Sequence, residues 1–444
     1  MSVDRSIKDH PKTIFGWCMY DWANSAYATT VLAGLLPFYF AEVVVGPDGV
    51  TWGSRVYAAD TLWSFFVGVA AFIAFLFAPA LGALADFSAT KKRFLLSFGY
   101  TGALFTMLLY FCRSGDVLMT LLFFLIAQVG FIGGNIFYDA FLPHIASQER
   151  MDWVSGKGYA YGYVGGGLQF GLALGLILGH RWLGLSQESA ARLAMLMAGL
   201  WWAGFALFTV KHLKEAPSRN LLPERYQRWP RWLAYVAVGV SRTTQTLRQV
   251  SRFRHLLLFL IAFMLYNDGI QTVIAVATVY GTVELHLDVT VLMLTLLMIQ
   301  AIASVGALLF GWLAERVGAK VAVMITLLLW SGVVSYAYFI ETAGQYLFLG
   351  GVVGLVLGGS QALSRSFYGS MIPEEASAEF YGFYTVFSKF SAIWGPLAFA
   401  AISQITGSSR SAIIALVVFF IAGLGFLALV DEDKARRAKL AGAF

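Results

Sequence analysis

The chain contains the stretch GWLAERVGAK at residues 311–320, between two long apolar runs, and a related stretch, GALAD, at residues 82–86. In both stretches a glycine stands four residues before an acid, and basic residues follow. The two glycines, at positions 82 and 311, lie about half of the 444 residues apart. A motif that recurs at half the chain length predicts two related halves.

The residues around these stretches are strongly apolar. Hydrophobic residues make up 59% of the chain and charged residues only 13%, a composition that excludes a soluble or a disordered protein. Runs of roughly 20 apolar residues, long enough to cross about 30 Å of hydrocarbon, occur twelve times. We predict an all-α membrane protein with twelve transmembrane helices in two pseudo-symmetric six-helix bundles, with spans at 14–42, 58–84, 94–112, 117–142, 158–182, 190–210, 255–281, 289–314, 319–340, 345–370, 380–404 and 411–430.

The basic residues predict the orientation of these spans. Most of the 31 Lys and Arg residues fall on the side of the termini, whereas Arg55, Arg113, Arg181, Arg192 and Arg410 fall on the other, so we expect both termini in the cytoplasm.

The predicted domains are an N-terminal bundle (1–210), a basic cytoplasmic linker (211–254), and a C-terminal bundle with a short tail (255–444). The linker segment WLAYVAVGVSRTTQTLRQV mixes apolar and basic residues at helical spacing. It is either an interfacial helix against anionic headgroups or a solvated connector.

Two further pairs of motifs support a duplication. Span one carries Asp21 and Asn24, and span seven carries Asp268 and Gln271, so each places a carboxylate and an amide on one helix face. Spans four and ten share a glycine pair, GGN at 133–135 and GGS at 358–360.

The glycine–acid–basic loop resembles the signature loop of the major facilitator superfamily. The second copy is the better match, because the first has Phe87 where a basic residue is expected and no glycine at Ala89. The segments YDWANSAYATTV (20–31), NIFYDAFLP (135–143), GGSQALSRSFYGSMIP (358–373) and KFSAIWGP (389–396) resemble the autophagy-related vacuolar amino-acid effluxer branch of that superfamily and its bacterial relatives. The resemblance covers essentially the whole chain.

This resemblance implies a secondary transporter that exports amino acids and is a monomer, like most members of the superfamily. It also implies a role for the two signature loops in switching between inward- and outward-facing states, with glycines that permit close helix approach and acids beside helix N-termini. The residues concerned are Gly82, Asp86, Gly311, Glu315, Arg316, Gly318 and Lys320.

Three ionisable residues, Asp21, Asp268 and Lys389, lie deep in their spans, where each needs a partner or a water-filled cavity. In one interpretation, Asp21, Asn24, Asp268 and Gln271 line a cavity between the halves and contact a polar substrate, with Lys389 as counter-ion. In the other, they form a structural network between helices. The aspartates also leave proton coupling open.

A second polar group belongs to corresponding spans of the two halves: Asn135, Tyr138 and Asp139 of span four, and Ser360, Gln361, Ser364 and Arg365 of span ten. We expect a cytoplasmic gate in which Arg365 pairs with Asp139. An ordinary cap on two helix ends is the alternative.

No motif indicates catalysis, a cofactor or a metal. The sequence has no phosphate-binding GxxxxGK[ST] motif, and its six histidines fall in loops or at span ends, without a base for a serine nucleophile or a cluster for zinc. Nucleic-acid binding is also excluded, because the net charge of +6 is spread over short loops rather than gathered on one face.

We therefore expect a carrier that exports a small polar solute, foremost amino acids, by alternating access. The alternatives are a proton-coupled exporter of other metabolites or drugs, and a lipid-handling or non-transporting membrane receptor. The expected partners are a small-molecule substrate, protons in the coupled case, and the lipid bilayer. The absence of an N-x-[ST] sequon fits a bacterial inner membrane, with a vacuolar membrane as the alternative.

Overall fold

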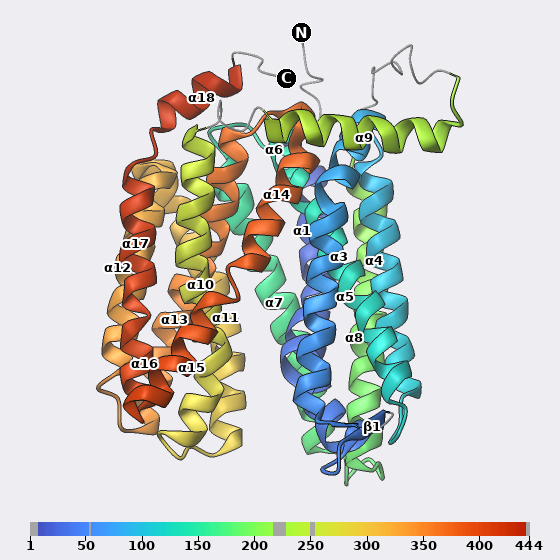
Figure 1. Ribbon diagram of the computed structural model, residues 1–444, viewed down its shortest axis with the longest axis vertical. Coiled ribbons are helices and arrows are strands. Elements are labelled where there is room, and N and C mark those ends of the chain that lie inside the picture. Colours follow the sequence, from blue (N-terminus) through green and yellow to red (C-terminus); the bar gives the residue numbers. More distant parts are fainter. Residues whose placement is uncertain (1–7, 53–54, 216–227, 249–253, 441–444) are drawn as a thin grey trace.

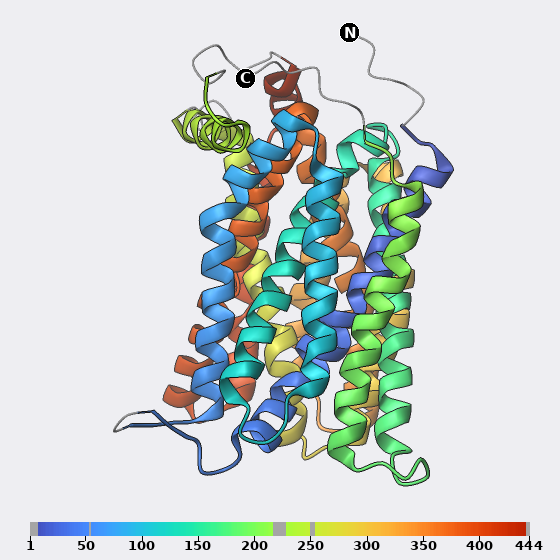
Figure 2. The same ribbon diagram turned by 90° about the vertical axis from the view of Figure 1, so that its right-hand side faces the viewer.

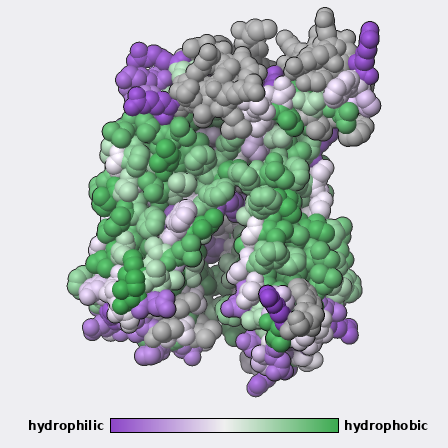
Figure 3. Space-filling view, viewed as in Figure 1, coloured by the Kyte–Doolittle hydropathy of each residue, from purple (hydrophilic) through white to green (hydrophobic). Residues whose placement is uncertain are grey.

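The computed structural model describes residues 8–52, 55–215, 228–248 and 254–440 and is built almost entirely of helices that run along one axis (Figures 1 and 2). Within the described residues, twelve helical segments are long and apolar enough to cross a membrane, and each coincides with one of the predicted spans. The chain is thus an all-helical, multi-pass membrane protein. Figure 3 shows the matching surface, with an apolar belt between two polar ends.

The first six spans form one bundle, which lies on the right in Figure 1. Span one begins as α1 (Pro11–Ala26) and continues through η1 (Tyr27–Leu35), α2 (Leu36–Tyr39) and η2 (Phe40–Val45). The other spans are α3 (Ala59–Ser88), α4 (Lys91–Leu108) with η3 (Leu109–Phe111), α5 (Val117–Ala140) with α6 (Leu142–Ile145), α7 (Met151–Leu178) and α8 (Gln187–His212).

The last six spans form the second bundle. They are α10 (Arg254–Val283), α11 (Val289–Val317), α12 (Ala319–Ala337), α13 (Ala343–Met371), the pair α14 (Ser377–Phe390) and α15 (Trp394–Thr406), and the pair α16 (Ser409–Ala415) and α17 (Val417–Ala428). The short helix η6 (Glu374–Ala376) precedes α14, and α18 (Glu432–Leu440) follows the last span.

Two lysines at equivalent positions show the relation between the halves. Lys92, at the start of α4, donates to the carbonyl oxygens of Val210 and Leu213 at the end of α8, at 2.8 and 2.7 Å. Lys320, at the start of α12, donates to the carbonyls of Ala428 and Val430 at the end of α17, at 3.0 and 2.6 Å. In each half the third span thus caps the C-terminus of the sixth, where a cation is favoured.

The bundles meet along two seams that depend on glycine. Along the seam of α7 with α11, a Cβ at Gly156 would lie 2.5 Å from the carbonyl oxygen of Ala307. Along the seam of α3 with α14, a Cβ at Gly82 would lie 2.3 Å from the carbonyl oxygen of Ala378. Only a residue without a side chain permits backbones to come this close.

Three features were not predicted. Span one contains π-helical turns, Tyr27–Leu35 and Phe40–Val45, a form that often marks functional positions. The loop after it forms a short antiparallel pair, β1 (Val50–Trp52) with β2 (Arg55–Tyr57). Span eleven, predicted as one helix over 380–404, is broken between Phe390 and Trp394.

The linker contains one described helix, α9 (Arg231–Arg248), which lies across the end of α3 in Figure 1, transverse to the spans. A Cβ at Gly239 would lie 2.6 Å from the carbonyl oxygen of Ala80, so α9 is seated directly on α3. This position fits the predicted interfacial helix, which remains a prediction. Linker residues 216–227 and 249–253 lie outside the described residues.

We predict that Lys320→Met lowers the thermal unfolding temperature of the detergent-solubilised protein. The variant loses a cation that binds two carbonyl oxygens at the end of α17, a contribution of about 1 kcal/mol. Lys434→Met is the control, because the Lys434 side chain is 65% exposed. Equal unfolding temperatures for both variants would contradict the capping role.

Candidate functional site

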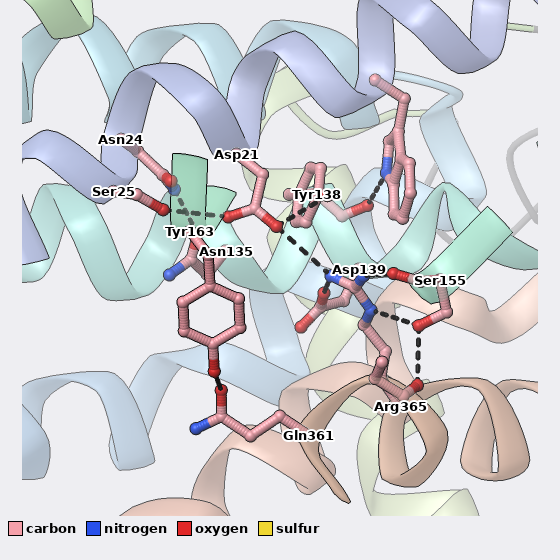
Figure 4. A network of polar contacts seen from close by, with 12 residues as sticks. Asp21, Asn24, Ser25, Asn135, Tyr138, Asp139, Ser155, Tyr163, Gln361 and Arg365 are labelled. Atoms are coloured by element: carbon pink, nitrogen blue, oxygen red, sulfur yellow. Dashed lines mark hydrogen bonds and ion pairs between the residues drawn. The ribbon is translucent and has the colours of Figure 1, made fainter. Parts of the chain in front are cut away.

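Arg365, on α13, is the centre of a polar network between the two bundles (Figure 4). Its side chain is 2% exposed and forms a 3.0 Å ion pair with Asp139 of α5, so the expected pair is present. The guanidinium also donates to the hydroxyl and the carbonyl oxygen of Ser155 of α7, at 3.0 and 2.9 Å. One buried cation of the second half is therefore held by two helices of the first.

Three aromatic rings surround this guanidinium. Its carbon lies 4.1 Å from the ring centroid of Tyr159, 4.8 Å from that of Trp17 and 5.2 Å from that of Tyr138. A planar, weakly hydrated guanidinium suits such a setting better than an ammonium group. Sequence reasoning did not assign Ser155 or Tyr159 to the site, because Gly-rich span five indicated only close packing.

Asp21 stands beside this network. Its carboxylate accepts hydrogen bonds from Tyr138 at 3.1 Å and Ser25 at 3.3 Å, and lies 4.0 Å from the Arg365 guanidinium. It packs against Gly162 of α7, where a Cβ would lie 2.7 Å from the carboxylate. Its expected partner Asn24 donates to Asn135 at 2.6 Å. Asp21 and Asn24 thus join helices of the first half, behind the cavity wall.

A cavity of about 140 Å³ lies between the halves. Its wall includes seven of the predicted site residues: Asn135, Asp139, Gln271, Ser360, Gln361, Ser364 and Lys389. Its aromatic wall, with Tyr159, Tyr266 and Tyr384, was not predicted.

Lys389 lines this cavity from the last turn of α14. No described side chain forms a hydrogen bond or an ion pair with its ammonium group. The predicted neutralisation of Lys389 by an aspartate is therefore not present in this state.

Of the two interpretations offered for Asp268, its position fits the structural contact between helices, because Asp268 does not line the cavity. It is 2% exposed, and its carboxylate accepts the backbone N–H of Gly395 at 2.8 Å, at the first turn of α15. Successive helix residues point about 100° apart, so the preceding residue, Asn267, lines the cavity instead.

The serines and the glutamine of span ten have partners on three other helices. Ser364 shares a 2.7 Å hydrogen bond with Tyr266 of α10. Ser360 accepts from the indole of Trp330 at 3.2 Å, and Gln361 accepts from Tyr163 of α7 at 2.7 Å. Of these contacts, only the last crosses between the halves.

The first signature loop bridges the halves near the termini. The Asp86 carboxylate pairs with Lys91 at 2.9 Å and accepts the backbone N–H of Glu379, in the first turn of α14, at 2.9 Å. Lys91 also contacts His144 at 2.8 Å and the Ser377 hydroxyl at 3.3 Å. Lys91, the first of the basic residues that follow the first stretch, thus supplies the partner of Asp86, a pairing that the sequence had not predicted.

The second loop, although the better match to the signature, has fewer contacts between the halves. Gly311 approaches α7, where a Cβ would lie 3.1 Å from the carbonyl oxygen of Asp152. Glu315 and Arg316 are exposed, and Arg316 lies over the ring of Trp312 at 3.9 Å. Gly318 has a φ of +87°, which favours glycine, and Lys320 caps α17 as described above.

These contacts close one end of the space between the bundles. The first signature loop and α9 lie at the end shared with α18, whereas Figure 3 shows a hollow between the bundles toward the opposite end. The structure is therefore a state that is closed on the side of the termini.

The family model described as "Vacuole effluxer Atg22 like" matches residues 9–440. The chain is 33% identical over 429 residues to an uncharacterized MFS-type transporter, YxiO, of Bacillus subtilis (strain 168), with 96% of each chain covered. It is 24% identical over 533 residues to autophagy-related protein 22 of Coccidioides immitis (strain RS), which covers 96% of this chain and 87% of the relative.

Solved structures show the same fold. The human organic anion transporter MFSD10 (TETRAN) superimposes with a TM-score of 0.67 at 15% identity, covering 94% of this chain and all of that one. The major facilitator transporter FucP in its outward conformation gives a TM-score of 0.68 at 12% identity, covering 96% of this chain and 100% of FucP. The major facilitator fold and the family resemblance are thereby confirmed, and these relatives are transporters rather than enzymes.

We predict that Arg365→Ala destabilises the protein by about 3 to 5 kcal/mol, because it leaves the Asp139 carboxylate buried without its ion pair. The double variant Arg365→Ala with Asp139→Asn is expected to recover part of this loss. Denaturant unfolding in detergent measures both. A double variant no more stable than Arg365→Ala would contradict the ion pair as the cause.

We further predict that Gly82→Ala separates α3 from α14 and opens the end near the termini. The added methyl would collide with the backbone at Ala378, whereas at Gly332 of α12 it would meet nothing within 4 Å. Labelling of a cysteine at Ser377, on the closed side, is expected to speed up with Gly82→Ala and to stay unchanged with Gly332→Ala. Equal labelling in both variants would show that this close approach does not hold the end shut.

Proposed function

This chain belongs to the vacuole effluxer Atg22-like family of major facilitator transporters, and we propose from that premise that it exports small zwitterionic solutes, foremost amino acids. The solute would bind in the cavity between the halves and would be released by alternating access.

The observation that carries the proposal is the unpaired Lys389 ammonium in the wall of a cavity whose other polar groups are amides, hydroxyls and one carboxylate. An uncompensated cation inside a membrane protein is expensive unless a ligand or water stabilises it. A solute carboxylate would supply the missing charge. The carboxylate in the wall is Asp139, which would receive the solute's amino group, whereas Asp21, which the sequence offered as a substrate contact, does not line the cavity.

Binding and switching are linked in this arrangement, because Asp139 is also the ion-pair partner of Arg365. A solute ammonium group at Asp139 would compete with the guanidinium that holds α13 to the first half. Weakening that contact favours the opening of the end near the termini. A proton on Asp139 would have the same effect, so proton coupling belongs to the same proposal.

The second candidate is the export of other metabolites as organic anions, favoured by the same unpaired cation. MFSD10, one of the similar structures, is an organic anion transporter. Such a solute would need Lys389 but not Asp139. Lys389→Ala would therefore impair transport of either solute, whereas Asp139→Asn would impair only that of amino acids.

Counterflow in proteoliposomes tests the proposal. Vesicles are loaded with unlabelled amino acids, labelled tracers are added outside, and the assay is repeated with an imposed pH gradient. Accumulation of an amino-acid tracer supports the proposal, and a response to the gradient supports coupling. A second series uses organic anions as tracers, and accumulation of these alone favours the second candidate. If folded protein accumulates neither amino acids nor organic anions, a receptor or lipid-handling role is favoured.

We predict that Lys389→Ala raises the KM for amino-acid counterflow about tenfold or more, because a desolvated charge contact is worth about 1.5 to 3 kcal/mol. Lys389→Arg is expected to retain part of the affinity. Lys434→Ala, at an exposed position, serves as the control and should leave the KM unchanged. An unchanged KM in Lys389→Ala would remove Lys389 from the binding site.

A further inference from the structure

We propose that Asn267 and Asp268 form a clamp on the break in span eleven, and that this clamp positions Lys389 and holds α15 apart from α3. The inference rests on the proposed transport function, because it assigns the clamp a role in that cycle. It makes Asp268 a positioning residue, with no contact of its own to the solute.

Neighbouring residues of α10 hold the two sides of the break. The Asp268 carboxylate accepts the backbone N–H of Gly395, on the α15 side, at 2.8 Å. The Asn267 amide donates to the hydroxyl of Ser391, on the α14 side, and that hydroxyl donates to the carbonyl oxygen of Ser388 at 2.7 Å. The first turn of a helix has unpaired backbone N–H groups and favours a nearby acid. The break creates such a helix start at α15, and the Asp268 carboxylate accepts one of its N–H groups.

The contact between α10 and the start of α15 leaves no room for a side chain at residue 395. A Cβ at Gly395 would lie 2.0 Å from the Thr272 hydroxyl and 2.9 Å from the Asp268 carboxylate. No described lysine or arginine forms an ion pair with Asp268. The carboxylate is therefore held by backbone N–H donors of α15 rather than by a cation.

The first half contains the same contact without the break. Asp21 packs against Gly162 of α7, and a Cβ there would lie 2.7 Å from the carboxylate. Because α7 is continuous from Met151 to Leu178, it has no free N–H at that level, and Asp21 binds Tyr138 and Ser25 instead. Packing of a carboxylate on a glycine thus does not by itself break a helix. The break is a specific property of the second half.

The break separates two differently anchored segments. The segment before it, α14, is seated on α3, where a Cβ at Gly382 would lie 2.9 Å from the backbone nitrogen of Pro79. The segment after it, α15, is seated on α10 of its own half. Figure 1 shows α14 leaning toward the first bundle and α15 in the lower part of the second bundle. When the halves rock, the angle between the segments must change at this point.

Lys389 lies two residues before Ser391 and lines the cavity. The geometry of the break therefore sets where its ammonium group stands. A solute bound to Lys389 contacts the segment 389–395, which the clamp holds at Ser391 and Gly395. Occupancy of the cavity is thereby coupled to the position of α15.

The test compares Asp268→Asn with Asp268→Ala in the full-length protein in proteoliposomes. The asparagine retains an oxygen that accepts the Gly395 N–H, so its transport is expected to stay within about threefold of the original, whereas the alanine loses about tenfold. Asp288→Ala is the matched control, because Asp288 also caps a helix, accepting the Thr290 N–H at 2.7 Å, but far from the break. It should leave transport unchanged.

A second readout needs no substrate. A cysteine placed at Thr385 lines the cavity, while the native Cys18 and Cys112 are both fully buried. Asp268→Ala is expected to slow labelling of this cysteine by a membrane-impermeant thiol reagent about fivefold, as α15 moves toward α3, and the asparagine variant and the control should label normally. If the solute has been misidentified, transport is silent in every variant but this labelling pattern persists.

Two results would overturn the clamp. Normal labelling in Asp268→Ala would show that the contact does not hold α15, and equal impairment of the alanine and asparagine variants would show that the charge acts and not the hydrogen bond. Should the alanine variant fail to fold, Ser391→Ala removes the partner of Asn267 on the other side of the break. It is expected to slow labelling in the same direction, and normal labelling there would equally contradict the proposal.

Discussion

The arrangement of the two bundles depends on the burial of one positive charge. The Arg365 side chain is buried, and a guanidinium in that position must find several acceptors and an anion at once. It finds them on helices of the other half, at Asp139 and at Ser155. In the proposed transport cycle this contact would act as a switch as well as a support, because any state in which the halves separate there must offer the guanidinium new partners or admit water.

The closed end of the structure, on the side of the termini, is held by backbone contacts as well as by this charge. At Gly82 and Gly156 the backbones of the two halves approach so closely that dispersion contacts of the main chain replace side-chain packing. Asp86 adds a carboxylate at the start of α14, where the helix end is positive.

The sequence predicted the twelve spans, the two halves and the Arg365–Asp139 pair, because apolar length, repeated motifs and opposite charges at equal depth are visible in one chain. It could not predict which face of a helix each residue occupies. Asp268 and Asn267 are neighbours, yet one caps α15 and the other lines the cavity. The break in span eleven was missed although the sequence contains a signal for it: Pro396 has no N–H to bond the carbonyl oxygen of Ala392, so it interrupts a helix there and fits the first turn of a new one.

The departures from symmetry between the halves therefore carry the functional information. Asp21 and Asp268 occupy equivalent spans and each packs on a glycine, but only the second meets a helix end. The first half keeps its carboxylates near Arg365, and the second half leaves Lys389 unpaired beside a break. In the proposed cycle the duplicated fold would supply the rocking motion, and the unequal placement of charge would supply the solute site: negative groups held by one half, an unpaired positive group by the other, and a cavity between them.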